Sequence, residues 1–372
     1  MSAGHDDVRQ MAADLAWALR GGPAVWVFAP GVAVPRGGKL PDGAALVIGT
    51  SGSTDAPKRV VHTRDSLVAS AAMVREALGG DGTWLLALPT HYIAGAQVLA
   101  RSALAGTEPE IVDPGFTPAE FVDATNRLTA RAARSFVSLV PPQLAKLVDA
   151  SGSNLAVARA LGAYDAILLG GQAAPAALVA AVERLGARVI RTYGAAETGG
   201  GCVYDGRPLA NVDLRATADG VLEVRGPMLA AGYLDAPDAT AAAFTTDPDG
   251  TRWYRTNDLI DERALAAGSV RVLGRADDVI NSGGVKVVLG EIERAVRAVA
   301  ADAVAVRVPD ERWGERAAIV TTAGVKLDDL ITLVDAAGLH PAARPVRVVR
   351  VRAIPMLSTG KPDRLAAQQL AQ

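Results

Sequence analysis

A run rich in glycine and hydroxyl groups is the first segment of the sequence whose residue types could do chemistry. The hydrophobic pair Val47 and Ile48 leads into Gly49, and the run continues from Thr50 to Lys58. Backbone N–H groups, hydroxyls and a lysine can bind a polyphosphate, and glycine lets the main chain approach it closely. The run lacks the Gly-Lys-Ser/Thr of a Walker loop. A surface turn of small polar residues remains the alternative interpretation.

Two more loops follow hydrophobic runs and carry reactive side chains. His91 lies just after the run that ends at Leu88, and an imidazole there can line a pocket or orient a carboxylate. Further on, Tyr193 offers a ring on which a base can stack, Glu197 offers an oxygen for Mg²⁺, and Thr198 offers a hydroxyl for a phosphate. Taken singly, a histidine more often has a structural role, and both segments are compatible with ordinary loops.

The last third of the chain holds two further groups of candidates. Asp258 and Arg275 could share the hydroxyls of a ribose, because a carboxylate accepts two hydrogen bonds at once. Lys361 lies in a Ser-Thr-Gly-Lys-Pro segment whose flexibility would let the lysine swing into a site. The alternative is that these are charged residues on a solvated surface.

Alternating short aliphatic runs and longer helical stretches must position these loops, and this alternation predicts an α/β fold of layered helices and sheets. The expected strands of the first part are Ala24–Phe28, Ala44–Ile48, Trp84–Leu88, Glu110–Val112, Ser135–Val140, Ala166–Leu169 and Arg188–Arg191. The expected helices include Arg64–Leu78, Pro118–Arg131 and Pro175–Leu185.

Beyond Glu197 the pattern changes to short strands and turns, which indicates a β subdomain. Its expected members are the strands Val212–Leu214 and Val221–Val224 and the turn Asp247–Gly250. A hydrophilic passage, Asp261–Ala276, leads to the helices Glu291–Val299 and Leu327–Ala336 and the strands Ala303–Val308 and Val346–Val351. We therefore expect two domains, residues 1–275 and 276–372.

Length and composition exclude several classes of protein. A chain of 372 residues exceeds what one core usually supports, and its net charge of -2 argues against a nucleic-acid binder. A single cysteine, Cys202, allows no internal disulfide and fits a reducing compartment. The first residues carry acids where a signal peptide carries bases, and no apolar run is long enough to span a membrane. We expect a cytoplasmic protein without membrane insertion.

Taken together and in this order, the segments resemble the adenylate-forming superfamily of acyl-CoA synthetases, peptide adenylation domains and luciferases. The similarity runs from about Val47 to Arg364 and includes the shorter segments Arg225–Pro227, Gly232–Leu234 and Val308–Glu315. Each motif is weak alone, and five at family-like intervals are specific. The resemblance implies a large N-terminal domain of layered α/β and β subdomains, followed by a small mobile α/β domain.

The resemblance also implies roles for residues at matching positions. Lys361 would be the adenylation lysine, His91 the gate near the acyl site, Glu197 the magnesium ligand and Asp277 the hinge between the domains. Phosphate contacts would come from Thr50, Ser51, Gly52, Ser53, Thr54, Lys58 and Thr198. Other nucleotide contacts would come from Gly171, Gln172, Ala173, Tyr193, Gly194, Asp258 and Arg275, and the thiol would approach along Gly283 and Gly284.

The implied reaction uses ATP, Mg²⁺ and coenzyme A. A substrate carboxylate attacks the α-phosphorus of ATP, releasing pyrophosphate and forming an acyl-adenylate. The C-terminal domain then turns, and the thiolate of coenzyme A takes the acyl group and releases AMP. The implied partners are a small-molecule acid and the two cosubstrates, and the sequence leaves a homodimer open.

The chain departs from the superfamily pattern in its short N-terminal part and in Asp55 and Asn257, which stand where glycine is usual. The short N-terminal part, the segment around His91 and the glycines after Thr198 are most similar to compact actinobacterial o-succinylbenzoate-CoA ligases of menaquinone biosynthesis. Such an acid has a second carboxylate that needs a cation or several N–H donors. Another acyl- or aryl-CoA ligase, an enzyme that loads a carrier protein, and an inactive nucleotide-binding module remain alternatives.

Overall fold

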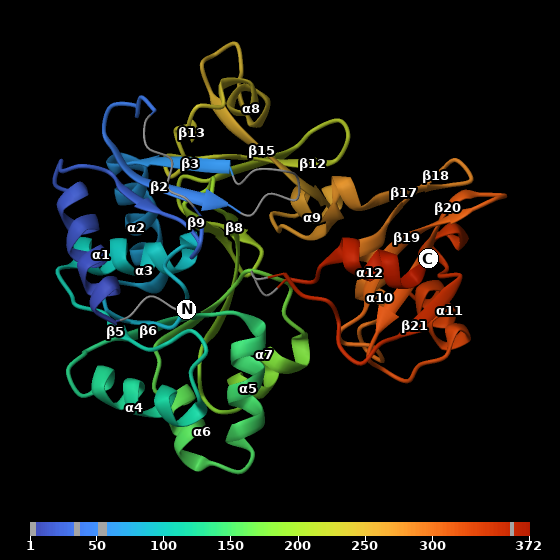
Figure 1. Ribbon diagram of the computed structural model, residues 1–372, viewed down its shortest axis with the longest axis horizontal. Coiled ribbons are helices and arrows are strands. Elements are labelled where there is room, and N and C mark those ends of the chain that lie inside the picture. The colour runs from blue at the N-terminus through green and yellow to red at the C-terminus, as the bar shows by residue number, and fades with distance from the viewer. Residues whose placement is uncertain (1–4, 33–37, 51–57, 358–360) are drawn as a thin grey trace. The chain divides into compact units, whose positions relative to one another are not determined.

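Figure 1 shows the computed structural model, which describes residues 5–32, 38–50, 58–357 and 361–372. The chain divides into two compact units. The first unit comprises residues 1–215 and 223–255, and the second comprises residues 216–222 and 256–372. The domain boundary expected between residues 275 and 276 stays a prediction, because compactness does not locate a point of rotation.

A seven-stranded sheet forms the centre of the first unit, with the strand order β10-β9-β8-β7-β6-β4-β5. The strands from β4 to β8 pair in parallel, whereas β9 runs antiparallel to β8. Their bounds are Thr83–Leu86 for β4, Glu110–Ile111 for β5, Ser135–Leu139 for β6, Ala166–Leu169 for β7, Val189–Ala195 for β8, Gly200–Tyr204 for β9 and Arg207–Pro208 for β10. The carboxyl ends of the parallel strands therefore meet at one edge of the sheet.

Helices cover both faces of this sheet. One face packs against α4 (Pro118–Thr129), α5 (Pro141–Ser151), α6 (Leu155–Gly162) and α7 (Ala176–Glu183). The other face lies against α2 (Arg64–Leu78) and α3 (Ile93–Ala105), with α1 (His5–Ala18) beside α3. The faces follow from side-chain alternation along a strand: Leu85 packs under α4–α7, whereas its neighbour Trp84 faces α2 and α3.

Capping residues explain where two of these helices begin and end. The Thr63 side chain accepts a hydrogen bond from the Ser66 N–H at 3.2 Å at the start of α2. Gly79 ends the same helix with φ of 78°, a left-handed conformation that glycine adopts without a steric penalty. Thr117 and Glu120 form a reciprocal capping box at the start of α4.

Two smaller sheets follow, of which the first belongs to the first unit and the second contains residues of both units. The first has the order β1-β2-β3-β13, with bounds Val25–Val27, Ala44–Thr50, Lys58–Thr63 and Gly232–Tyr233. The second has the order β11-β12-β15-β14, with β16 also paired to β15. Its bounds are Asp213–Ala216, Val221–Arg225, Arg252–Ile260, Phe244–Thr246 and Val272–Arg275. Helix α8 (Pro237–Ala243) lies between β13 and β14 in the sequence.

The second unit contains a five-stranded sheet with α-helices on both faces. The order is β18-β17-β20-β19, with β21 paired to β20, and the bounds are Val285–Val288, Val279–Ser282, Gly314–Thr321, Val304–Asp310 and Arg347–Arg350. Helices α10 (Leu289–Val296) and α11 (Leu327–Ala336) pack on one face, and α12 (Arg364–Ala371) packs on the other. The unit also contains α9 (Glu262–Ala266) and the 3₁₀ turns Ala276–Asp278 and Pro341–Ala343.

The predicted α/β fold is confirmed, and the helices Arg64–Leu78 and Leu327–Ala336 and the strand Ala166–Leu169 have the predicted bounds. The hydrophilic passage Asp261–Ala276 contains a short helix and a strand that its polar composition concealed. In the described part of the chain, no helix combines the length and apolar character needed to cross a membrane.

Candidate active site

The predicted phosphate loop connects two paired strands. β2 ends at Thr50 and β3 begins at Lys58, and these two residues face each other across the antiparallel pair. The Thr50 hydroxyl donates to the Lys58 carbonyl oxygen at 3.4 Å. Of the remaining candidates, Ser51, Gly52, Ser53 and Thr54 lie outside the described residues. The structure therefore fixes the two ends of the loop in one place.

Tyr233 joins one end of this loop to the predicted metal ligand. The ammonium Nζ of Lys58 lies 4.8 Å from the centre of the Tyr233 ring, a cation–π distance. The Tyr233 hydroxyl donates to Oε1 of Glu197 at 2.8 Å, and β13 brings this tyrosine alongside β3. Burial and the neighbouring Glu197 carboxylate raise the pKa of Tyr233, so the tyrosine remains a donor at neutral pH. Lys58 and Glu197, far apart in the sequence, thus share one neighbour.

Glu197 could supply one carboxylate oxygen to a metal ion whose remaining ligands are phosphate oxygens and water. Its side chain is only 8% exposed, and one carboxylate oxygen is occupied by Tyr233. Mg²⁺ in nucleotide sites usually takes one or two protein carboxylates and completes its shell with phosphate oxygens and water. The described residues contain no cluster of three or more metal-binding side chains, so Glu197 fits only this kind of shared site.

A buried histidine supports the turn that carries Glu197. His62 has no exposed surface, and its Nε2 lies 2.7 Å from the carbonyl oxygen of Ala196. A carbonyl only accepts, so Nε2 carries the proton and Nδ1 faces the Ser66 hydroxyl at 3.1 Å as an acceptor. Burial lowers the pKa of His62 to about 4. The hydrogen bond to Ala196 raises the pKa and so offsets part of the effect of burial. The neutral imidazole is therefore a structural support at physiological pH.

Thr198 is buried and hydrogen-bonded within the same turn. Its hydroxyl accepts from the Ala195 N–H at 2.8 Å and lies 2.7 Å from the Gly200 carbonyl oxygen, to which it donates. Gly194 must be glycine here, because a Cβ would stand 2.0 Å from that same carbonyl oxygen. A phosphate contact by Thr198 stays a prediction. To donate to a phosphate, the hydroxyl must give up its hydrogen bond to the Gly200 carbonyl oxygen.

The predicted adenine contacts lie at the carboxyl ends of two neighbouring strands. β7 ends at Leu169, which pairs with Arg191 of β8, so the segment Gly171, Gln172 and Ala173 and the residue Tyr193 follow adjacent strands. Gly171 has φ of 84°, which reverses the chain just past the sheet edge. Parallel strands of this kind bind ligands outside their carboxyl ends. The topology thus places these candidates at one edge.

His91 lies at the same edge, just before α3. Its ring centre is 4.3 Å from that of Tyr92, the residue that precedes the helix. Burial lowers the pKa of His91, which keeps the imidazole neutral at physiological pH. Gly95 allows the close approach of the first helical turn to the loop, since a Cβ there would meet the Pro89 carbonyl oxygen at 2.3 Å.

Helix α3 also carries buried polar groups that the sequence analysis did not single out. Gln97 is fully buried and neither its oxygen nor its nitrogen has a partner, and the Nε atom of Arg101 is likewise buried without one. An unsatisfied buried polar group costs about 1–3 kcal/mol, and a charged one more. The sequence signal was available: Gln97 and Arg101 are four residues apart in a helix whose other residues, apart from Ser102, are apolar or glycine, and so they share one face.

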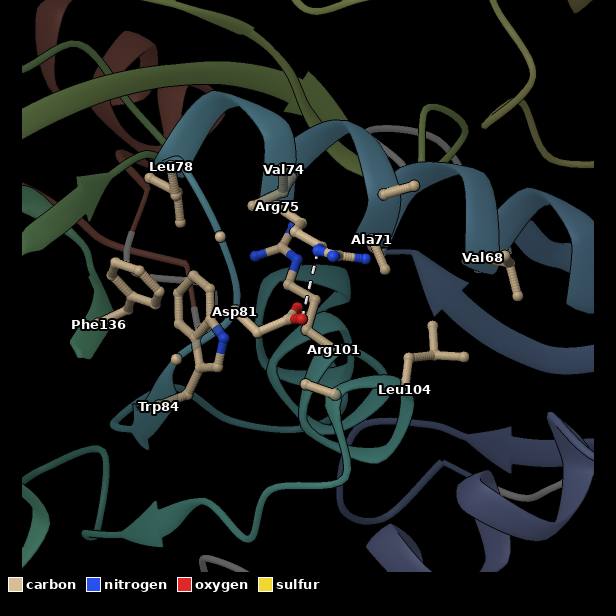
Figure 2. A pocket seen from close by; sticks show the side chains of 14 residues that line it. Val68, Ala71, Val74, Arg75, Leu78, Asp81, Trp84, Arg101, Leu104 and Phe136 are labelled. Carbon is tan, nitrogen blue, oxygen red and sulfur yellow. Dashed lines mark ion pairs between the residues drawn. The ribbon is translucent and has the colours of Figure 1, made fainter. Parts of the chain in front are cut away.

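Figure 2 shows Arg101 in a pocket of about 210 Å³ between α2 and α3. The Arg101 side chain, 8% exposed, lies with its guanidinium carbon 5.2 Å from the centre of the Trp84 ring. Arg75 and Asp81 form an ion pair of 3.2 Å in the same pocket. Gln97, one turn before Arg101, lies against Gly199 and Gly200, where a Cβ would come within 3.3 Å and 3.7 Å of its side chain. The pocket that Arg101 lines could admit an anionic or polar ligand.

In the second unit, two predicted ribose contacts lie on paired strands. Asp258 of β15 faces Arg275 of β16 across their antiparallel pair. The Arg275 guanidinium makes a bidentate pair with Asp277, at 2.9 Å and 3.0 Å. Hydrogen bonds to Asp277 raise the pKa of Arg275 despite its partial burial. The predicted ribose arginine is thus tied to the predicted hinge residue, a link that spacing alone did not indicate.

The remaining candidates of the second unit lie on two turns. Gly283 and Gly284 form the two-residue turn between β17 and β18, with φ of 60° and 85°, as a type I′ hairpin requires. The side chain of Trp313 covers Gly283, where a Cβ would stand 2.4 Å away. Lys361 is exposed, and its carbonyl oxygen accepts from the Leu357 N–H at 2.8 Å.

Comparisons with known proteins agree with this arrangement. A family model described as AMP-binding enzyme matches residues 32–234. A probable 2-succinylbenzoate–CoA ligase from Mycobacterium tuberculosis is 39% identical over 89% of this chain and 85% of its own length. The solved o-succinylbenzoate coenzyme A synthetase from Bacillus subtilis, in complex with AMP, matches with a TM-score of 0.73 and 25% identity over 87% of this chain and 69% of its own. The same enzyme with its acyl-adenylate intermediate matches over 88% of this chain and 69% of its own, also with a TM-score of 0.73 and 25% identity.

Proposed function

The chain belongs to the family of AMP-binding enzymes, and on that premise we propose that it is an AMP-forming acid–thiol ligase. Its substrates are ATP, o-succinylbenzoate and coenzyme A, and its products are o-succinylbenzoyl-CoA, AMP and pyrophosphate. The observation that carries this proposal is the joining of Lys58 and Glu197 through Tyr233, beside a sheet edge suited to a nucleotide. We also assign it to the cytoplasm and leave open whether it forms a homodimer.

The first half-reaction joins two anions, so it depends on cationic and hydrogen-bonding groups. A carboxylate oxygen of the acid attacks the α-phosphorus of ATP, the bond to the β-phosphate oxygen breaks, and pyrophosphate leaves. Lys58, at the end of the phosphate loop, and Lys361 supply positive charge to the phosphates. Mg²⁺, when held through the second oxygen of Glu197, would offset charge on the same phosphates.

The second half-reaction transfers the acyl group. The thiolate of coenzyme A attacks the acyl carbonyl carbon, the carbon–oxygen bond to the phosphate breaks, and AMP leaves with that oxygen. We propose that the turn at Gly283 and Gly284 guides the thiol and that Asp277 is the residue about which the C-terminal domain moves. Lys361 then serves only the first half-reaction.

Arg101 is our candidate for the carboxylate of the substrate that is not activated. The Nε atom of the Arg101 guanidinium is buried without a hydrogen-bond partner, and a guanidinium suits a planar anion because it can donate two parallel hydrogen bonds. Arg101 lies eight residues beyond Ile93, roughly 12 Å along the helix axis at 1.5 Å per residue.

The reaction is tested by incubating the protein with ATP, Mg²⁺ and o-succinylbenzoate, together with either coenzyme A or a carrier protein bearing phosphopantetheine. We expect AMP, pyrophosphate and the coenzyme A thioester, identified by mass. A thioester that forms only on the carrier protein would contradict the proposed acceptor. Failure of o-succinylbenzoate to release pyrophosphate, while another acid succeeds, would contradict the proposed substrate.

The role of Arg101 is tested with Arg101→Met and with 4-oxo-4-phenylbutanoate, which lacks the ring carboxylate. We expect the variant to raise the KM for o-succinylbenzoate about 10- to 100-fold and to leave the KM for the analogue nearly unchanged. Arg75→Met, in the same pocket but paired with Asp81 and exposed, is the matched control. Equal losses with both acids would show that Arg101 only supports the helix.

A further inference from the structure

Arg364, a partly buried residue of the second unit, joins several segments and has no assigned role. It is the first residue of α12 and lies three residues after Lys361. Its Nε pairs with Oδ2 of Asp278 at 3.0 Å, and its Nη1 pairs with Oε1 of Glu293 at 2.8 Å. Nη1 also donates to the Ala305 carbonyl oxygen at 2.9 Å. One guanidinium thus holds groups from three separate segments.

These pairs differ from ordinary surface ion pairs in their burial. The side chains of Glu293 and Asp278 are 9% and 20% exposed, and that of Arg364 is 34% exposed. The Ala305 N–H also donates to the same oxygen of Glu293, at 2.9 Å, which fixes that carboxylate against β19. Burial raises the pKa of Asp278, and the positive charge of Arg364 opposes this rise. Water screens such pairs less than exposed ones, and removing one partner is costly.

The acidic partner Asp278 belongs to the turn that contains the proposed hinge. Ala276–Asp278 is a single 3₁₀ turn, and its middle residue, Asp277, is held by Arg275 through two hydrogen bonds. The last residue of the turn is held by Arg364. Two arginines therefore fix this turn, one from the preceding strand and one from the segment that follows Lys361.

Backbone hydrogen bonds flank the short stretch of chain from Lys361 to Arg364. The Leu357 N–H donates to the Lys361 carbonyl oxygen, and the Asp363 N–H donates to the Pro355 carbonyl oxygen, each at 2.8 Å. The Asp363 side chain then caps α12 by accepting from the Ala366 N–H at 3.0 Å. A displacement of Arg364 would therefore be passed to Lys361 through a short, hydrogen-bonded stretch of chain.

We propose that Arg364 is a positioning residue that couples the Lys361 segment to the hinge turn at Asp278, so that both move as one body. This inference rests on the proposed function, which gives Lys361 and Asp277 their roles. The coupling acts in the adenylation half-reaction, where Lys361 must reach the phosphates with the precision that catalysis requires. It has no role in thioester formation, because Lys361 has no role there.

Two variants break the coupling without leaving Glu293 unpaired. Asp278→Asn removes one acidic partner, and Arg364→Lys keeps a cation for Glu293 but loses the planar fork that spans two carboxylates. The full-length protein is assayed for pyrophosphate release and, separately, for thioester formation from supplied acyl-adenylate and coenzyme A. We expect each variant to lower kcat for adenylation about 10- to 100-fold, with KM for ATP and thioester formation nearly unchanged.

The matched control is Arg344→Lys, which disturbs a bidentate pair with Asp335 at 2.8 Å and 2.9 Å in the same unit. We expect no effect of this change on either half-reaction. The double variant of Arg364 and Asp278 should lose no more than either single variant, because the two residues act through one contact. Equal losses in both half-reactions, or additive losses in the double variant, would overturn the coupling.

Amide hydrogen exchange provides a test that does not depend on catalysis. We expect Asp278→Asn to speed exchange at the N–H groups of Leu357 and Asp363, which close the Lys361 segment, and Arg344→Lys to leave them unchanged. Unchanged exchange in Asp278→Asn would overturn the coupling even if the enzyme is active. Faster exchange in a protein that releases no pyrophosphate with any acid would support the coupling and reject the proposed function.

Discussion

The buried His62 predicts a specific loss of stability in mild acid. Burial lowers its pKa from 6.5 to about 4, so between these values the unfolded chain holds a proton on this side chain that the folded chain does not. Unfolding therefore takes up a proton in this window, and the stability of the folded state falls as the pH falls from about 6.5 to about 4. Below about pH 4 this group contributes no further change.

The magnitude follows from the size of the shift. The pKa of His62 lies about 2.5 below its ordinary value. At 1.36 kcal/mol for each pKa unit, this corresponds to roughly 3 kcal/mol of unfolding free energy. His62→Gln removes the titration while offering an amide donor toward the Ala196 carbonyl oxygen. The difference in unfolding free energy between wild type and variant should therefore narrow by about 3 kcal/mol between pH 7.5 and pH 4.

The assay is urea unfolding of the full chain at a series of pH values, with wild type, His62→Gln and the control His5→Gln. Other titrating groups cancel in the difference between wild type and each variant, provided that they lie far from the changed residue. We expect the difference in unfolding free energy between wild type and His62→Gln to depend on pH, and His5→Gln, at the exposed start of α1, controls for the loss of a histidine elsewhere. A difference for His62→Gln that does not change with pH would refute the reasoning.

Three further predictions concern the two half-reactions and the metal. Lys361→Ala should leave the affinity for ATP within about threefold of wild type and lower acyl-adenylate formation, measured by pyrophosphate release, by about 100-fold or more. Equal losses of ATP affinity and of acyl-adenylate formation would contradict the role of Lys361 in adenylation. Asp277→Pro should preserve adenylation and impair thioester formation, and unchanged overall turnover would contradict the rotation. Tyr233→Phe removes the hydrogen bond to Glu197 and should raise the Mg²⁺ concentration for half-maximal activity about tenfold. Titration of the activity with Mg²⁺ measures this concentration. An unchanged concentration would count against Glu197 as the magnesium ligand.

The sequence predicted best those elements whose signals are local. The helix Arg64–Leu78 has a threonine before it and a glycine after it, and these residues cap it in the structure. The strand Ala166–Leu169 is a short aliphatic run buried on both faces. By contrast, the helix Glu262–Ala266 was missed because its signal is one capping residue, Asp261, in a polar stretch.

Partnerships between distant residues could not be predicted from the sequence. His62 and Ala196 are 134 positions apart, and the Tyr233–Glu197 hydrogen bond depends on the placement of β13 beside β3. The same holds for Arg364, whose carboxylate partners lie on a turn and a helix far upstream. Motif resemblance singled out chemical groups, but only the fold shows which of them touch.

The second carboxylate of the substrate shows how a structure adds to a motif. The sequence indicates that a cation or several N–H donors must face this group, but it does not identify the residues that supply them. The structure adds Arg101 and Gln97, two residues on α3 whose buried polar atoms have no partners. The helix pattern contained both, but their burial and lack of partners could be seen only in three dimensions.

The transfer of one oxygen atom tests the central claim most directly. If the acid is activated as an acyl-adenylate, one oxygen of its aliphatic carboxylate becomes an oxygen of AMP when the thiol displaces it. We therefore expect o-succinylbenzoate labelled with oxygen-18 in that carboxylate to give AMP carrying one heavy oxygen, detected by mass, together with unlabelled pyrophosphate. Label found in pyrophosphate or inorganic phosphate, or AMP formed without label, would contradict the account.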